Sequence, residues 1–259
     1  MRVAAPVLGP VLTADARMLI AGVALAAWFR LSGFDPQWRR WGLHYVGAGM
    51  INSGLPFLLW AFAALSLSAG ELAVLNSTSP MWGAVLGAAF LGEPLTRPRV
   101  FGLLLGVAGV ALVAGPAPRG TTVAAWIAGI AAAACYGFIG VYLRRFAPGA
   151  PAKGLAVGTQ LAAGLIMLPL VFAWPPLSTP APMVLASIAA LGLVCGAVAY
   201  LLYFRLIADL GATGALTVTY LIPLFAMLWG AVFLHEPVTS RMAGGAVLVI
   251  LGTLMVLRK

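Results

Sequence analysis

Four consecutive polar residues, Asn76-Ser77-Thr78-Ser79, and then Pro80 interrupt a long apolar stretch. Pro80 has no N–H to donate to the Asn76 carbonyl, and its ring pushes against that carbonyl. In hydrocarbon the hydroxyls and the freed carbonyl need partners, which a water-filled cavity or a polar solute could supply. The alternative is that the hydroxyls bond back to carbonyls of their own helix. Because at least one of four consecutive residues must face inward, we favour the cavity and predict that Asn76, Thr78 and Ser79 bind substrate.

A second polar stretch has the same design, with Thr217, Thr219 and Tyr220 placed before Pro223. We therefore predict that Thr217 and Tyr220 share a site with the first stretch. Six aromatic residues lie near the same depth of their apolar stretches: Trp60, Trp82, Tyr136, Tyr200, Tyr203 and Tyr220. An aromatic-lined cavity suits amphipathic or aromatic solutes, and the alternative is that these residues pack between helices or form belts at the membrane surface.

Glu71 is a carboxylate inside an apolar stretch, with the first polar residues beyond it. Intramembrane carboxylates commonly mark ion or proton pathways, although Glu71 lies near the end of its stretch, where it could reach water. Arg17 could pair with it across helices. Glu71 and Arg17 are therefore our candidates for coupling, whereas Glu93 and Glu236, each followed by proline, are assigned a structural role in polar turns.

The sequence lacks the motifs of enzymes and metal sites. It contains no His-Glu-x-x-His, no Gly-x-Ser-x-Gly and no phosphate-binding loop. His44 and His235 have no second metal-type ligand at useful spacing, and the two cysteines lie in apolar runs. We predict no catalytic residues, no metal and no cofactor.

Composition identifies an integral membrane protein. Sixty-three per cent of the residues are apolar, only 8% are charged and the mean hydropathy is +1.05, whereas about a quarter of a soluble chain is charged. A span needs about 20 apolar residues. The sequence predicts an all-α fold whose partner is the lipid bilayer, with nine helices near 10–30, 42–65, 69–91, 97–115, 122–143, 153–174, 184–204, 212–234 and 239–257.

These helices belong to an internal repeat. At an offset of 143, Pro80, Gly87, Glu93, Thr96, Gly102 and Gly109 recur as Pro223, Gly230, Glu236, Thr239, Gly245 and Gly252. Upstream, at an offset of 142, Arg2, Pro6 and Gly22 recur as Arg144, Pro148 and Gly164. The halves span 1–115 and 122–259, an organisation typical of transporters built around a central site.

Nine helices divide unevenly between two halves. The second half opens with a full helix from Trp126 to Arg144, whereas Met1–Pro6 matches only the tail of that helix. The first helix of repeat one is therefore absent from this sequence, through either an internal start codon or a real nine-helix design. We favour the internal start and expect a form extended upstream to be more stable and more active.

The charges predict the orientation. The net charge is +9, but nearly all of the charges flank the apolar stretches, and no run of basic residues interleaved with aromatics appears. No nucleic-acid partner is therefore expected. If sides alternate, the loops of one side with the C-terminus hold eleven basic residues and the outer loops hold two, Arg119 and Arg241. Arg2 and Arg17 complete the fifteen and lie near the outer end of their helix. The eleven are Arg30, Arg39, Arg40, Arg97, Arg99, Arg144, Arg145, Lys153, Arg205, Arg258 and Lys259. By the positive-inside rule the C-terminus is cytoplasmic, and with five helices per repeat the halves are inverted.

Three segments carry a resemblance to a known family: Leu75–Pro80 through Gly92-Glu93-Pro94, its repeat Leu221–Pro223 through His235-Glu236-Pro237, and Ala16–Gly22 around Arg17. In these segments the sequence resembles the EamA family of the drug/metabolite transporter superfamily. The resemblance covers essentially the whole chain. It implies two inverted five-helix repeats in the inner membrane, usually in an exporter of amino acids or other small metabolites.

We therefore expect a secondary transporter that exports a small-molecule substrate, such as an amino acid or a drug-like solute, across the cell inner membrane. The alternative is a non-transporting or truncated membrane protein, or an accessory subunit, of the same fold. The sequence does not identify the solute, the coupling ion or the oligomeric state.

Overall fold

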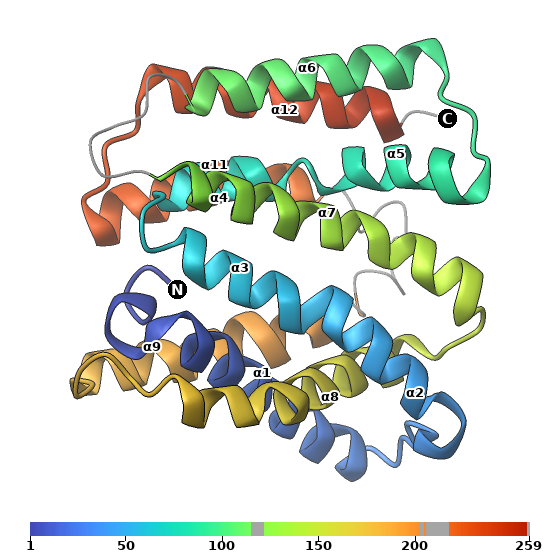
Figure 1. Cartoon of the computed structure of the whole chain (residues 1–259), viewed down its shortest axis with the longest axis vertical. Coiled ribbons are helices and arrows are strands. Elements are labelled where there is room, and N and C mark those ends of the chain that lie inside the picture. The colour runs from blue at the N-terminus through green and yellow to red at the C-terminus, as the bar shows by residue number, and fades with distance from the viewer. Residues whose placement is uncertain (115–121, 203–204, 206–217, 258–259) are drawn as a thin grey trace. The chain divides into compact units, whose positions relative to one another are not determined.

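The protein is described here by a computed structural model covering residues 1–114, 122–202, 205 and 218–257 (Figure 1). These residues form helices and loops, with no strand among them. The helices are α1 (Ala5–Leu31), α2 (Trp38–Gly49), η1 (Met50–Gly54), α3 (Leu55–Ala63), α4 (Ala69–Asn76), α5 (Ser79–Leu91), α6 (Arg97–Ala114), α7 (Val123–Phe146), α8 (Ala152–Ala173), α9 (Pro182–Gly192), η2 (Leu193–Val198), α11 (Val218–Leu234) and α12 (Ser240–Leu257).

Three predicted spans differ from continuous α-helices, and one of them, 184–204, contains the π-helical segment η2 after α9. The stretch predicted at 69–91 is two helices, α4 and α5, because Pro80 in the first turn of α5 cannot continue the hydrogen bonds of α4. The stretch predicted at 42–65 runs from Trp38 to Ala63 without a break, as α2, the π-helical segment η1 and α3. Within the described residues, seven helices are long and apolar enough to cross a membrane.

The chain forms two compact units that do not follow the order of the sequence. Unit 1 takes residues from Met1–Leu65 and Tyr142–Ala215, and unit 2 from Ser66–Val141 and Leu216–Lys259. Each unit therefore combines segments from both halves of the sequence.

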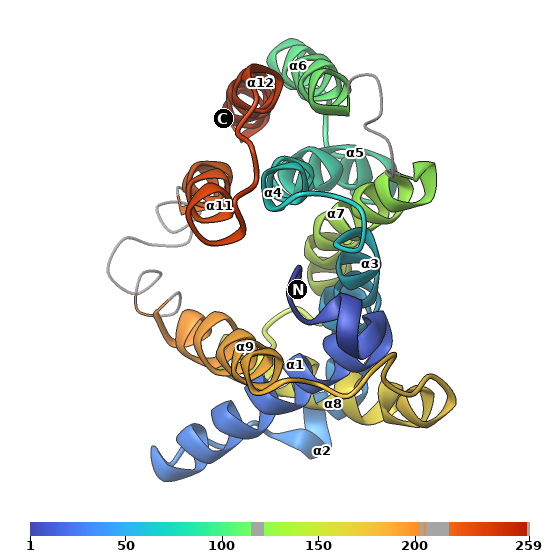
Figure 2. The same cartoon turned by 90° about the vertical axis from the view of Figure 1, so that its left-hand side faces the viewer.

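In unit 1 the equivalent helices α1 and α8 pack closely (Figures 1 and 2). A Cβ added at Gly22 would lie 2.7 Å from Leu161 Cδ2, and one added at Gly164 would lie 2.6 Å from Leu19 Cδ2. Gly22 is the repeat equivalent of Gly164, and Leu19 of Leu161, so each helix contacts the other through the same two positions. The order of these contacts makes α1 and α8 antiparallel.

Unit 2 repeats this arrangement with α6 and α12, which lie side by side in Figure 1. A Cβ at Gly102 would lie 2.5 Å from the Gly252 carbonyl oxygen, and one at Gly109 would lie 2.8 Å from that of Gly245. Gly245 and Gly252 are the repeat equivalents of Gly102 and Gly109. The helices are again antiparallel, and the small-residue spacing serves close helix packing.

Two π-helical segments occupy equivalent positions of the two halves. Segment η1 begins at Met50 and η2 at Leu193, which is the repeat offset of 143. A Cβ at Gly49, just before η1, would lie 2.7 Å from the Thr159 carbonyl oxygen of α8. The equivalent Cβ at Gly192, just before η2, would lie 2.6 Å from Ile20 Cβ of α1. Such segments are rare and frequently occur at functional sites.

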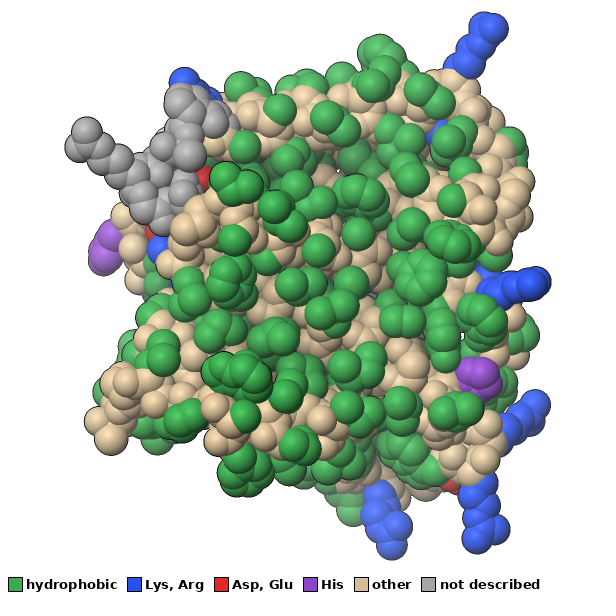
Figure 3. Space-filling view, in the orientation of Figure 1, with side chains coloured by type: hydrophobic (Ala, Val, Ile, Leu, Met, Phe, Trp, Pro, Cys, Tyr) green, Lys and Arg blue, Asp and Glu red, His purple; other side chains and the backbone are tan. Residues whose placement is uncertain are grey.

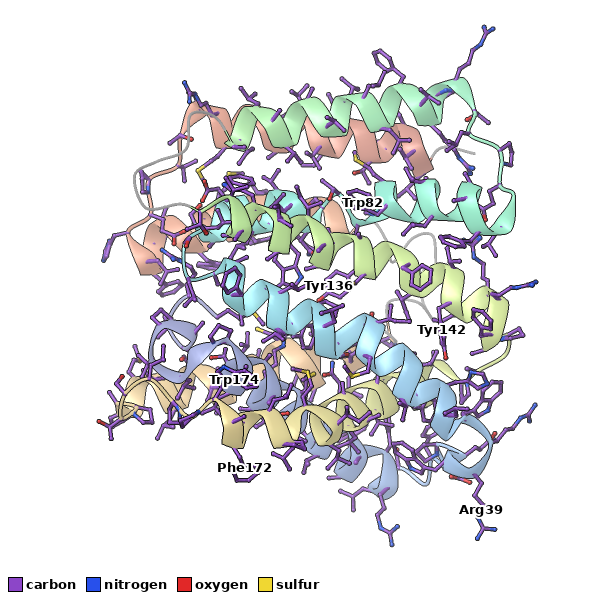
Figure 4. The ribbon with its side chains drawn as sticks, viewed as in Figure 1. Arg39, Trp82, Tyr136, Tyr142, Phe172 and Trp174 are labelled. Carbon is purple, nitrogen blue, oxygen red and sulfur yellow. The ribbon has the colours of Figure 1, made fainter. Side chains whose placement is uncertain are left out.

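The outer surface is apolar, as a lipid environment requires. Leu31 is 87% exposed and Phe172 is 82% exposed. Figure 3 shows hydrophobic side chains over most of the visible face, with Lys and Arg at its rim. In Figure 4 the Arg39 and Phe172 side chains extend away from the ribbon. With its apolar helices, this surface is that of a multi-pass membrane protein.

Candidate substrate site

The hydroxyls of the first polar stretch bond to their own helix. Ser77 Oγ donates to the Ala73 carbonyl at 2.9 Å, Thr78 Oγ1 to that of Leu75 at 2.6 Å, and Ser79 Oγ to that of Asn76 at 2.6 Å. The Ala73 and Leu75 carbonyls also accept the backbone N–H groups of Ser77 and Thr78, so these hydroxyls add second hydrogen bonds at the end of α4. Our argument from unpaired donors was therefore wrong for these residues. Substrate binding by Asn76, Thr78 and Ser79, whose oxygens can still accept hydrogen bonds, stays a prediction.

A side chain of α12 also forms a hydrogen bond to the backbone at the break between α4 and α5. Thr253 Oγ1, which is buried, donates to the Ser77 carbonyl at 3.1 Å. This contact joins residues 176 apart in the sequence. Sequence reasoning missed Thr253, although an isolated threonine in an apolar run was an available signal.

The second polar stretch is only partly within the described residues. Thr217 and Tyr203 lie outside them, and the Tyr220 side chain does too, although its backbone belongs to α11. Their assignment to a site stays a prediction.

The described aromatic candidates belong to different units. In unit 2, Trp82 of α5 and Tyr136 of α7 lie on neighbouring helices, because a Cβ at Gly137 would lie 2.6 Å from Trp82 Cβ (Figure 4). In unit 1, Trp60 is buried on α3, and Tyr200 Oη accepts a hydrogen bond from Asn52 Nδ2 at 3.5 Å.

The carboxylate of Glu71 caps the N-terminus of α4. Glu71 Oε2 accepts hydrogen bonds from Ser68 N at 2.7 Å and from Ser68 Oγ at 2.8 Å, and Ser68 Oγ accepts from Glu71 N at 3.3 Å. This is a capping box, and its Ser-x-x-Glu signature was readable in the sequence. Glu236 Oε2 accepts from the next backbone N–H, that of Ala69, at 2.7 Å. The structural role predicted for Glu236 is confirmed.

Arg17 belongs to unit 1, and its guanidinium carbon lies 3.8 Å from the centroid of the Phe57 ring. A cation over an aromatic face is attracted by the negative face of the ring. This contact gives Arg17 an aromatic partner on α3. Coupling by Arg17 or Glu71 stays a prediction.

Unit 1 contains a set of buried polar atoms that sequence reasoning missed. Nine buried side-chain nitrogen or oxygen atoms have no hydrogen-bond partner among the described residues, and all nine lie in this unit. They are Thr13 Oγ1, Asp15 Oδ1, Arg17 Nε, His44 Nδ1, Ser53 Oγ, Trp60 Nε1, Thr159 Oγ1, Gln160 Nε2 and Gln160 Oε1. Polar groups inside apolar helices are costly, and the lone Gln160 in an apolar run was a readable signal.

Comparison with known proteins identifies the family. The sequence profile described as the EamA-like transporter family matches residues 1–115 and 123–258. An uncharacterized transporter of Bacillus subtilis, YvbV, is 26% identical over 248 residues, which is 93% of this chain and 80% of that protein. A protein of Streptantibioticus cattleyicolor named a probable terminal-alkyne amino-acid exporter is 28% identical over 206 residues, covering 78% of this chain and 68% of that protein.

Two further comparisons extend over more of the chain. An uncharacterized transporter of Archaeoglobus fulgidus is 26% identical over 97% of this chain and 90% of that protein. A solved crystal structure has a TM-score of 0.66 at 22% identity and covers 96% of this chain and 87% of its own, a similarity that concerns the fold alone. Because the family profile matches both halves, the chain belongs to the EamA-like transporter family.

Proposed function

We propose that this protein is a secondary transporter that exports small organic metabolites, such as amino acids or drug-like solutes, across the cell inner membrane. Membership of a transporter family supports the reaction class. The relative named a probable terminal-alkyne amino-acid exporter supports amino acids as the first solutes to test and export as the direction.

The observation that carries the proposal is the reciprocal packing of equivalent helices. The contacts between Gly22 and Leu161 and between Gly164 and Leu19 make α1 and α8 antiparallel, although one is the repeat of the other. The glycine contacts of α6 and α12 give the same relation in unit 2. Helices that are related by the repeat and run in opposite directions are those of inverted halves, the design used for alternating access.

The antiparallel packing of repeat-related helices supports a more detailed topology. The proposed fold has two inverted repeats and nine spans, of which 69–91 is the broken pair α4–α5 and 212–234 includes α11. The eleven basic residues then lie on the cytoplasmic side together with the C-terminus. The substrate pathway follows the interface between the repeats, which inside unit 1 is the packing of α1 against α8.

Efflux from proteoliposomes tests the function. The purified chain is reconstituted into liposomes loaded with a labelled panel of neutral, basic and acidic amino acids and amphipathic dyes. The efflux rate is compared with that of protein-free liposomes. We expect faster efflux of at least one class of solute. If every solute leaves at the protein-free rate, with or without an imposed proton or sodium gradient, the protein is not a transporter and the accessory role gains support.

A further inference from the structure

The two units differ in whether their buried polar side chains have hydrogen-bond partners. In unit 2 the buried hydroxyls of Ser77, Thr78 and Thr253 each donate to a backbone carbonyl of that unit. In unit 1 the buried hydroxyls of Ser53 and Thr159 and both polar atoms of Gln160 have no hydrogen-bond partner among the described residues. An unpaired polar group is costly in an apolar interior. Unit 1 is therefore the part of the described chain whose interior is suited to an additional polar partner.

Gln160 lies on α8, which packs against the π-helical segment η1. Ala156 and Met167 precede and follow it by four and seven residues, so the three side chains share one face of α8. Ala156 packs in one cluster with Ala197 of η2. Met167 faces η1, because a Cβ at Gly54 would lie 3.2 Å from Met167 Sδ. The Gln160 face of α8 thus borders η1 at Met167 and, at Ala156, a hydrophobic cluster that includes Ala197.

Other contacts bring further polar groups to the same region. Thr159 adjoins Gln160, and its backbone meets Gly49 at the start of η1. Ser53 belongs to η1 itself, and η1 packs against α8. Asn52 of η1 donates to Tyr200, two residues beyond the end of η2.

We infer that Gln160, Thr159 and Ser53 form a recognition site for the zwitterionic head group of a neutral amino acid. The inference rests on the proposed transport function and names its substrate class. Gln160 Nε2 and the two hydroxyls donate to a carboxylate, and Gln160 Oε1 accepts from an ammonium group. None of the three side chains is charged, so the site matches a head group with no net charge. A solute with a net charge would be left without compensation in a low-dielectric interior.

Access to this site requires α8 to separate from η1, because Gln160 is only 1% exposed. The π-helical segments provide a place where this can happen, since their hydrogen bonding is less regular than that of an α-helix. Closed and opened arrangements of unit 1 then correspond to a shielded and an accessible site, as alternating access requires.

Thermal unfolding of the purified chain in detergent tests the site. The probes are alanine, leucine and phenylalanine, with lysine and glutamate as charged comparisons. A ligand that binds the folded state raises the Tm, and we expect the neutral amino acids to do so. Gln160→Leu removes an unpaired amide at nearly constant volume. It should raise the ligand-free Tm by about 2–4 °C and require about tenfold more amino acid for the same ligand shift.

A matched pair of variants keeps the test decisive if Gln160→Leu does not fold. Thr159→Val and Thr253→Val make the same chemical change in two buried threonines. Thr159 has an unpaired hydroxyl, so its variant should keep or raise the Tm and weaken the ligand shift. Thr253 donates to Ser77, so its variant should lower the Tm and leave the ligand shift intact.

Two results would overturn the site. One is a ligand shift in Gln160→Leu or Thr159→Val that equals the wild-type shift at the same amino-acid concentration. The other is a lower ligand-free Tm in both variants together with an unchanged ligand shift. That result would mean that these side chains stabilise the fold, with water as their hydrogen-bond partner, and do not bind the amino acid. Failure of the transport function looks different, since no solute would leave wild-type proteoliposomes faster than protein-free ones. Wild-type efflux of neutral amino acids with no loss in Gln160→Leu would reject this site alone.

Discussion

At the scale of single residues, the decisive property is whether a buried polar atom finds a partner inside the protein. Thr78 and Gln160 are both buried polar residues in apolar helices. Thr78 lies just after the last turn of α4, where its hydroxyl donates back to the Leu75 carbonyl. Gln160 lies in mid-helix, where backbone carbonyls are already paired. The sequence could predict that both are unusual, but only the helix break distinguishes their hydrogen bonding.

The hydrogen bond from Thr253 gives a residue-scale prediction. Thr253→Val keeps the shape of the side chain but leaves the Ser77 carbonyl without its buried donor. We expect a loss of about 1 kcal/mol of stability, measured by thermal unfolding in detergent. Thr253→Ser keeps the hydroxyl and serves as the control. Equal loss in both variants would show that packing of the methyl group, and not the hydrogen bond, stabilises this position.

A second residue-scale prediction concerns the N-terminus of α4. The carboxylate of Glu236 accepts from the Ala69 backbone N–H, beside the Ser68–Glu71 capping box. A carboxylate is favourable there because the N-terminus of a helix carries partial positive charge. Glu236→Gln should therefore lower stability by about 0.5–1 kcal/mol, again read from the Tm. An unchanged Tm at low ionic strength would contradict the capping role.

At the scale of elements, the sequence predicted close helix packing but only part of the helix irregularity. Spacings such as Gly102-x-x-x-Gly106 indicate close approach of helices in a membrane, and α6 does pack closely against α12. The break at Pro80 was indicated by the proline, although one span was predicted there. Pro56, in the first turn of α3 directly after η1, has no N–H to donate to the Asn52 carbonyl, so an irregularity there was readable in the sequence. Segment η2 contains no proline and carried no such signal.

A pair of glycine substitutions tests the packing of α6 and α12. A Cβ at Gly109 would lie 2.8 Å from the Gly245 carbonyl oxygen, whereas one at Gly42 would meet no atom within 4 Å. Gly109→Ala should destabilise the protein by about 1–3 kcal/mol because the helices must separate. Gly42→Ala should be neutral or stabilising, since alanine favours the helix. The measurement is the fraction of monodisperse protein that survives heating, and equal survival of both variants would contradict the close packing.

At the scale of the whole molecule, the glycine contacts join helices at positions related by the repeat offset. The sequence did not reveal that each compact unit takes helices from both halves. An offset states which positions are equivalent but not which of them meet. The contacts arise only when apolar faces from distant segments are buried together, and this selection depends on tertiary packing.

The proposed orientation gives the last prediction. If the halves are inverted, the eleven basic residues, with Lys259 among them, lie on one side, and loop 115–121 lies on the opposite side. The positive-inside rule makes the basic side cytoplasmic. A fluorescent protein that folds only in the cytoplasm should therefore be bright when fused after Lys259. A phosphatase that is active only in the periplasm should be active when inserted in loop 115–121 and inactive when fused after Lys259.

Replacing Arg144 and Arg145 with Ala removes basic charge from the cytoplasmic side, so it should weaken the preference for a cytoplasmic C-terminus. Replacing Arg241, on the opposite side, should not weaken it. Phosphatase activity after Lys259 in the wild-type chain would reverse the proposed orientation.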